Sequence, residues 1–146
     1  MLDDLVTLFD RNLGLLLQEL NLFRDEARLW QTTGTIKNTA GNLCLHLVGN
    51  LNTYIGKNLG HLPYTRDRDA EFSRRGVSRQ TLIEMVEETK QRVHASLSAM
   101  PAKQLDDTYV ENVMGYEMTT RYFLMHLVAH LSYHLGQINY IRRALE

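Results

Sequence analysis

The sequence predicts an all-α protein built as a four-helix bundle, and two observations carry this prediction. Four long segments place apolar residues at alternating spacings of three and four, which is the pattern of amphipathic helices. Only two prolines occur, Pro63 and Pro101, and both fall between these segments. The 146 residues, 44% apolar and 23% charged, are typical of one globular domain, which we expect to span residues 1–146.

The first segment runs from about residue 2 to residue 30. Its apolar stripe is nearly unbroken and consists of Leu2, Val6, Phe9, Leu13, Leu16, Leu20, Phe23, Ala27 and Trp30. A second row consists of Leu8, Leu15, Leu22 and Leu29, more than about 100° away around the helix. This row can face another helix of the same bundle, which is the interpretation we favour, or another subunit.

The other three predicted helices span about residues 39–57, 78–100 and 119–145, and Ser78 is a good N-cap for the third. Residues 58–77 join the second and third helices and are long enough to run the length of a bundle, which lets those two helices lie parallel. In the last connection, residues 109–112 and 115–118 predict a small hairpin.

Two stretches, residues 38–56 and 122–141, contain no formal charge. Their length suits a membrane span, but one holds four asparagines and a histidine and the other three histidines, a glutamine and an asparagine. Because polar groups at this density are costly in hydrocarbon, we expect no membrane partner. The two stretches are predicted to be helices buried in a soluble bundle around an internal polar site.

Histidines mark this site. His126, His130 and His134 are spaced by four, so neighbours lie about 40° apart around the helix and about 6 Å along it and can share one ion. His126 and His134, about 12 Å apart along the axis, cannot. The pair is therefore His126 with His130 or His130 with His134, and His46 on the other uncharged helix is the natural third ligand. Three neutral imidazoles leave a coordination position open, as in catalytic metal sites.

These ligands suit several divalent ions. Zinc is the first choice, and nickel, iron or cobalt also accept imidazole. We do not expect a di-iron carboxylate site, because no Glu-x-x-His motif occurs. The plain alternative is that the histidines are hydrogen-bonded packing residues of the core.

Charge and cysteine content exclude other classes of protein. The net charge of −1, from 16 basic and 17 acidic residues, argues against a nucleic-acid partner. Cys44 is the single cysteine, which suits a reducing cytosol, and it lies about 200° from His46 around the helix, so we expect a packing thiol. The acidic N-terminal stretch is not typical of a signal peptide, and we expect a cytoplasmic protein.

The histidine-rich segments resemble a known family. Residues 126–138, HLVAHLSYHLGQI, resemble the last helix of the DinB-like (YfiT-like) metalloenzyme superfamily, where histidines four apart precede Gly-Gln-Ile. Residues 42–51, NLCLHLVGNL, and 66–72, RDRDAEF, resemble a branch of it that has no assigned reaction. The resemblance implies a bundle of up-down-down-up topology and a divalent ion held by His46, His130 and His134.

The resemblance also implies a function. Characterised relatives are similar to thiol S-transferases that use bacillithiol, mycothiol or glutathione, or to a thiol-dependent isomerase. Many relatives have asparagine, histidine and arginine where this chain has Ala129, Tyr133 and Leu135, so contacts around the ligands should differ. We expect a metal-binding enzyme that activates a low-molecular-weight thiol for transfer. The alternatives are a metal-hydroxide hydrolase and a non-catalytic bundle that binds metal or only dimerises.

Further residues are candidates for roles beside the metal. Asn50 could contact a bound water or substrate, Gln137 could orient His134, and His126 fits a position beside the ligands rather than among them. The charged crossover residues either form local salt bridges or bind an anionic substrate; they are Arg66, Arg68, Asp69 and Glu71. We expect a homodimer formed through the extra leucine row of the first helix or through the last helix near Tyr140 and Ile141.

Overall fold

The computed structural model describes residues 1–146 and contains helices but no strands, which confirms the all-α class. The long helices are α1 (Leu2–Leu22), α2 (Ala40–Leu51), α4 (Arg79–Ala99) and α5 (Thr120–Leu145). A π-helical segment, η2 (Asn52–Lys57), continues α2. Short helices occupy the connections: η1 (Glu26–Trp30), α3 (Arg68–Ser73) and η3 (Ala102–Asp106).

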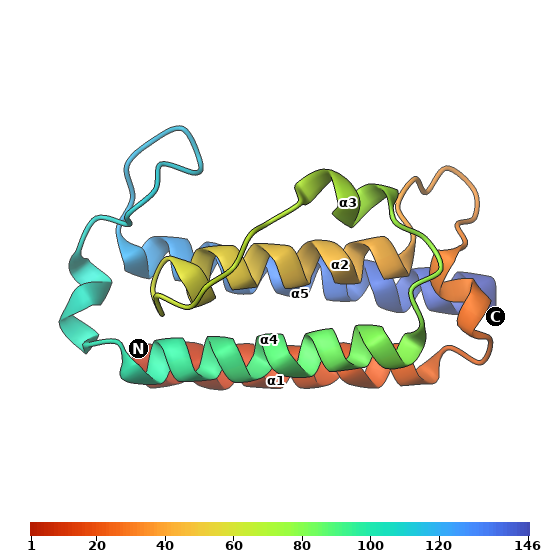
Figure 1. Cartoon of the computed structure of the whole chain (residues 1–146), viewed down its shortest axis with the longest axis horizontal. Coiled ribbons are helices and arrows are strands. Elements are labelled where there is room, and N and C mark those ends of the chain that lie inside the picture. The colour runs from red at the N-terminus through yellow and green to blue at the C-terminus, as the bar shows by residue number, and fades with distance from the viewer.

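The four long helices lie along the long axis of the molecule (Figure 1). α1 packs against α4 and α5, and α2 packs against the same two helices. α1 and α5 run in one direction and α2 and α4 in the other, so the chain between α2 and α4 crosses back along the outside of α2. This crossover carries α3, which contacts α2.

Side-chain caps set the beginnings of three of the long helices. In each, a hydroxyl accepts the backbone N–H of the residue three positions later, which satisfies a donor that the helix itself leaves free. The capping residues are Thr39, Ser78 and Thr119. Such a cap is worth about 1 kcal/mol, and the expected N-cap at Ser78 is confirmed.

The first helix is shorter than its stripe predicts. α1 ends at Leu22, Phe23 is extended, and η1 begins after Asp25, whose carboxylate accepts the N–H of Ala27. Phe23 is still 2% exposed, and the Trp30 indole donates to the carbonyl of Val77 at 3.1 Å. Beyond residue 22 the stripe predicted burial only in part: Phe23 is buried and Trp30 half-buried, but Ala27 is exposed and Leu29 of the second row is buried instead.

The second leucine row is covered only in part within the chain, where Leu8 is half-buried. Leu15 and Leu22 are 36% and 52% exposed, whereas Leu29 is buried in η1. The favoured interpretation, that a helix of the same bundle covers the row, is wrong for Leu15 and Leu22. The reason is that α4 and α5 both pack on the other sides of α1, where the first stripe lies.

The connections also differ from expectation. The predicted hairpin is reduced to one antiparallel bridge between Thr108 and Thr119, supported by a 2.9 Å hydrogen bond from the Tyr109 N–H to the Met118 carbonyl. No strands form because the chain between them turns away after one residue pair. α3 was not predicted, although Asp67 caps it by accepting the Ala70 N–H at 3.1 Å.

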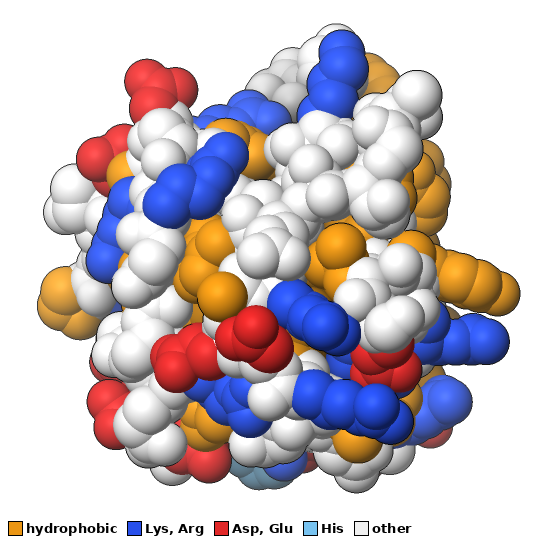
Figure 2. All heavy atoms as spheres, turned by 90° about the vertical axis from the view of Figure 1, so that its right-hand side faces the viewer, with side chains coloured by type: hydrophobic (Ala, Val, Ile, Leu, Met, Phe, Trp, Pro, Cys, Tyr) orange, Lys and Arg blue, Asp and Glu red, His pale blue; other side chains and the backbone are white.

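Thirty buried apolar residues form one core cluster, to which all four long helices contribute. No helix is long and apolar enough to cross a membrane. On the end of the molecule shown in Figure 2, lysine and arginine side chains are interspersed with aspartate and glutamate.

Candidate metal centre

Three histidines converge from two helices. His46 lies on α2, and His130 and His134 lie one turn apart on α5. The Nε2 atom of His130 is 3.1 Å from Nε2 of His46 and 3.1 Å from Nε2 of His134. The possible ligand atoms of the three residues all lie within 4.8 Å of one another. Of the two pairs on α5 that the spacing allowed, the structure joins His130 and His134 to His46.

His126 lies outside this cluster. Its ring stacks on Phe123, with centroids 5.8 Å apart, and its centroid is 6.2 Å from that of His130. It lines a cavity that reaches His130. The structure therefore places His126 beside the cluster, as the sequence suggested, one turn towards the N-terminus of α5.

Oxygen acceptors orient two of the three rings. Nδ1 of His46 is 3.0 Å from Oε1 of Glu71, and Nδ1 of His134 is 2.7 Å from Oε1 of Gln137. In a neutral ring that faces such an acceptor, Nδ1 carries the hydrogen and Nε2 keeps its lone pair. Both Nε2 lone pairs therefore point into the cluster, and the expected contact of Gln137 with His134 is present.

The cluster is well suited to a divalent cation. The Nε2 atoms of His46 and His134 each direct a lone pair at Nε2 of His130, 3.1 Å away. A neutral His130 carries at most one hydrogen on Nε2, so it can satisfy only one of these lone pairs, whereas a metal ion could accept all of them. Around an ion with metal–nitrogen distances of about 2.0–2.1 Å, tetrahedral ligands lie about 3.4 Å apart, close to these separations. Nδ1 of His130 is buried without a hydrogen-bond partner, so no oxygen orients this third ring.

Two of the three histidines, His130 and His134, are neutral near pH 7. Burial lowers the pKa of His130 to about 4, with further lowering from the neighbouring His134 and His46. The pKa of His134 is lowered mainly by burial, against the opposing effect of its hydrogen bond to Gln137. A metal ion would therefore meet two nitrogen donors for which protons do not compete at neutral pH.

Glu71 is the functional residue that sequence reasoning did not connect to the histidines. Arg66 donates from Nε to Oε2 at 2.8 Å and from Nη2 to Oε1 at 2.9 Å, and Nδ1 of His46 lies 3.0 Å from the same Oε1 atom. Burial raises the pKa of Glu71, but the hydrogen bonds from His46 and Arg66 outweigh this and keep the pKa below its usual value. The buried carboxylate is therefore charged and ion-paired at neutral pH.

A glycine makes room for this carboxylate. A Cβ atom on Gly49 would lie 1.9 Å from Oε2 of Glu71, so no other residue fits at this position without displacing the carboxylate. Gly49 follows His46 by three residues and thus shares its face of α2. A glycine one turn after a candidate ligand, beneath a crossover rich in acids, was the sequence signal that could have identified Glu71.

Two of the three buried asparagines of α2 and η2 hold helices together and do not line the site. Asn42 donates to the carbonyls of Glu71 and Arg74, both at 2.9 Å, and so holds α3 against α2. Asn52 donates to Thr89 Oγ1 on α4 at 2.9 Å. Only Asn50 lies at the cavity beside the histidines, so the uncharged stretch reflects helix tethering as much as a site.

A cavity of about 220 Å³ opens beside the cluster. His46, His130 and Asn50 lie at its inner end, and its walls include Tyr54 from η2 and the apolar side chains of Phe123, Leu127, Val113 and Met114. Arg68 and Met114 are exposed, so the cavity reaches the surface. This is the concave access that an open metal site requires and a closed structural site lacks.

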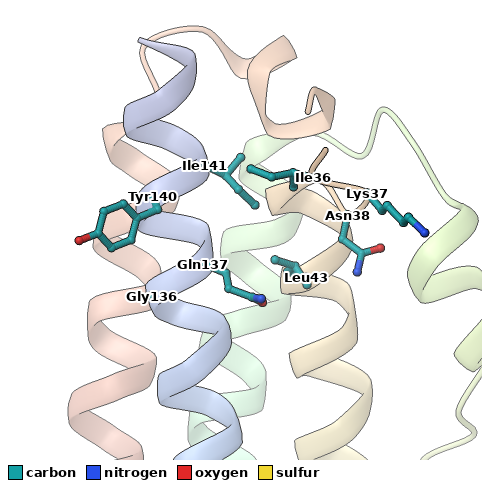
Figure 3. Close-up of a pocket in the computed structure, with 8 residues that line it drawn as sticks. All are labelled: Ile36, Lys37, Asn38, Leu43, Gly136, Gln137, Tyr140 and Ile141. Carbon is teal, nitrogen blue, oxygen red and sulfur yellow. The ribbon is translucent and has the colours of Figure 1, made fainter. Parts of the chain in front are cut away.

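A second cavity, of about 500 Å³, lies on the far side of Gln137 (Figure 3). It forms between the beginning of α2 and the C-terminal part of α5, and its walls include Ile36, Leu43, Tyr140 and Ile141. Gln137 lines it and also contacts His134, so this side chain separates the larger, mostly apolar space from the histidines.

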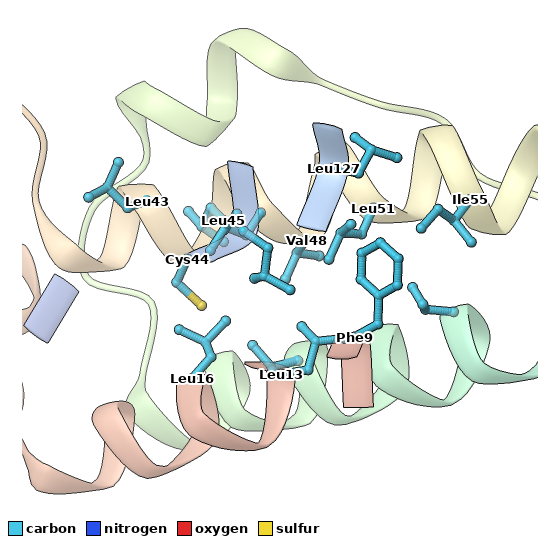
Figure 4. Close-up of a cluster of buried hydrophobic side chains, with 14 of the residues drawn as sticks. Phe9, Leu13, Leu16, Leu43, Cys44, Leu45, Val48, Leu51, Ile55 and Leu127 are labelled. Atoms are coloured by element: carbon cyan, nitrogen blue, oxygen red, sulfur yellow. The ribbon is translucent and has the colours of Figure 1, made fainter. Parts of the chain in front are cut away.

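Cys44 takes no part in the site. Its side chain points away from the crossover towards Leu16 and Leu13 of α1 (Figure 4), and the residue is fully buried. Burial raises the pKa of the Cys44 thiol to about 12, so the sulfur stays protonated. The predicted packing role is confirmed.

The fold and the site define an all-helical protein in which three histidines from two helices converge beside an open cavity. Comparison with protein families matches residues 8–138 to the DinB superfamily, a range that includes all three histidines. The chain belongs to the DinB superfamily, which confirms the resemblance of its histidine-rich segments. A comparison with curated proteins finds no match.

Proposed function

We propose that this protein binds one divalent metal ion through His46, His130 and His134 and is a thiol S-transferase that uses a low-molecular-weight thiol. Zinc is the first choice of metal, and nickel, iron and cobalt fit the same donors. The observation that supports an enzyme over a purely structural metal site is the cavity that runs from the surface to His46 and His130.

A bound divalent ion would lower the pKa of a thiol or water that reaches it. The chain's own residues hold and enclose this position. Glu71 and Gln137 retain the Nδ1 protons of His46 and His134 and so keep both Nε2 atoms directed inward. Phe123 and Leu127 give the cavity an apolar wall that limits the entry of water.

Two polar side chains in the cavity can form hydrogen bonds with a ligand. Asn50 places its Oδ1 atom one turn after His46, where it can accept a hydrogen bond from a bound water or thiol. His126 lines the same cavity and can accept or donate a proton. We propose these two residues, rather than Gln137, for contact with the substrate.

Cobalt substitution tests the proposed function. We expect the purified protein to bind one Co²⁺ per chain and to develop a sulfur-to-cobalt charge-transfer absorption when 2-mercaptoethanol is added, because the cavity leaves a position open. Turnover of an electrophilic aromatic halide with the thiol would support transfer. Cobalt binding without a thiol band, together with hydrolysis of an activated ester, would favour the hydrolase instead.

We also propose a homodimer of up-down-down-up bundles that meet through the outer face of α5. The helix directions in Figure 1 support this topology. The outer face of α5 carries uncharged, exposed residues at spacings of three and four: Tyr122, Met125, Ala129, Tyr133, Gly136 and Tyr140. Continuous exposed apolar faces of this kind mark interaction sites, whereas Leu15 and Leu22 of α1 stand seven residues apart.

Two matched variants distinguish these surfaces. Light scattering at micromolar concentration should give twice the chain mass of 16.9 kDa. Met125→Glu should shift the protein to monomer, because it places a charge in the proposed interface, while Leu22→Glu should not; the two side chains are 50% and 52% exposed. A dimer that only Leu22→Glu dissociates would assign the interface to α1, and a wild-type monomer would refute the dimer.

A further inference from the structure

The cavity beside the histidines has basic but no acidic side chains in its lining. Its polar groups are three imidazoles, two guanidinium groups, one amide and one phenol: His46, His126, His130, Arg66, Arg68, Asn50 and Tyr54. Glu71, the nearest buried carboxylate, faces the other side of His46 and is not exposed to the cavity. A ligand inside the cavity therefore encounters hydrogen-bond donors and positive charge.

The two arginines differ in how their charges are used. Arg66 is 14% exposed and forms a bidentate ion pair with Glu71, so its charge is already balanced. Arg68, at the first position of α3, is exposed at the cavity mouth and forms no hydrogen bond or ion pair with the protein. The adjacent Asp67 carboxylate is engaged in capping α3 and does not line the cavity.

An unpaired polar group lies at the inner end of the same cavity. Asn50 is only 7% exposed, and its buried Oδ1 atom has no hydrogen-bond partner. A buried polar atom without a partner costs about 1–3 kcal/mol, so a polar ligand that reaches it would recover this cost. Arg68 at the mouth and Asn50 inside thus provide two polar contacts along one cavity.

We propose that this cavity binds a small substrate that carries a carboxylate, with Arg68 holding the carboxylate at the mouth and Asn50 contacting a polar group inside. This inference rests on the proposed metal site, because a divalent ion on three neutral histidines adds charge that no protein carboxylate balances. A guanidinium pairs well with a planar carboxylate. At about 220 Å³ the cavity is below the range of about 300–1,000 Å³ typical of drug-sized ligands, which favours a small metabolite.

The test compares two thiols of equal length on the cobalt-loaded protein, 3-mercaptopropionate and 3-mercapto-1-propanol, by their sulfur-to-cobalt absorption. We expect the wild type to bind the carboxylate thiol more tightly by roughly tenfold, because a charge-assisted contact is added. Arg68→Gln should abolish this preference while leaving the affinity for the neutral thiol unchanged. Arg74→Gln, which removes the same charge at the other end of α3 and outside the cavity, should retain the preference.

The outcomes separate this inference from the proposed function. Equal affinities for the two thiols in the wild type, or a preference that survives Arg68→Gln, would overturn the carboxylate site while the metal site stands. If Arg68→Gln and Arg74→Gln lose the preference equally, the preference arises from the overall positive charge of α3, and the assignment to Arg68 is overturned. Failure of the wild type to bind cobalt or either thiol would refute the proposed function, and the carboxylate site with it.

Discussion

Replacing any one of His46, His130 and His134 with alanine should remove stoichiometric metal from the purified protein. The Nε2 atoms of all three rings meet in one place, so each would supply one of only three protein ligands. Structural zinc sites bind with about 10–16 kcal/mol over four ligands, so losing one ligand should weaken binding by about 3 kcal/mol, more than a hundredfold. Metal analysis of the purified variants measures this directly.

His126→Ala is the matched control, since it removes an imidazole from the same helix one turn before His130. It should weaken binding by at most about ten- to a hundredfold, as is usual for residues beside the ligands. All four variants should keep wild-type helical circular dichroism, because the core of 30 buried apolar residues does not include the histidines. Full occupancy in His46→Ala would refute the site between α2 and α5, and metal loss confined to His126→Ala and His130→Ala would mean that the other pair binds.

The helices could be predicted from sequence where side-chain periodicity and backbone geometry agree. In α4, Ser78 caps the first turn and apolar residues recur to the end, so the expected and observed bounds nearly coincide. At residues 23–30 the periodicity continues past the end of α1: Phe23 and Trp30 reach the core from an extended residue and from the short helix η1, but Ala27 of the same stripe is exposed. Periodicity predicts burial only as far as the helix continues, and the cap at Asp25 indicates that a new element begins there.

The candidate metal site was also predictable from sequence in one respect and not in another. Spacing on one helix restricted the histidine pairs on α5 to two, and the family resemblance, not the spacing, selected His130 with His134. Contacts between distant segments could not be predicted in the same way, because Glu71 reaches His46 across 25 residues through a short helix that Asn42 holds in place. Of the charged crossover residues, Arg66 and Glu71 form the expected salt bridge, whereas Arg68 remains without a partner.

Glu71→Gln should weaken metal binding by roughly ten- to a hundredfold without unfolding the protein. Glutamine keeps the shape of the side chain but replaces the charged carboxylate, whose oxygens accept hydrogen bonds from both Arg66 and His46, with a neutral amide. His46 Nδ1 would then face a weaker acceptor, or an amide nitrogen that cannot accept at all, so the ring would lose its fixed tautomer and be a poorer ligand through Nε2. The measurement is the zinc dissociation constant by competition with a chromophoric chelator.

Two further variants show whether Glu71 acts through His46 or only through the stability of α3. Asp69→Asn removes an exposed carboxylate from the same short helix and should leave the zinc affinity unchanged. Gly49→Ala should reproduce the effect of Glu71→Gln with all charges intact, because the new Cβ would occupy the space of Oε2. Nitrogen-15 shifts of the His46 ring, which distinguish the two tautomers, should change in Glu71→Gln and Gly49→Ala but not in Asp69→Asn. Wild-type zinc affinity in Glu71→Gln would show that the carboxylate serves only to balance the charge of the buried Arg66 guanidinium.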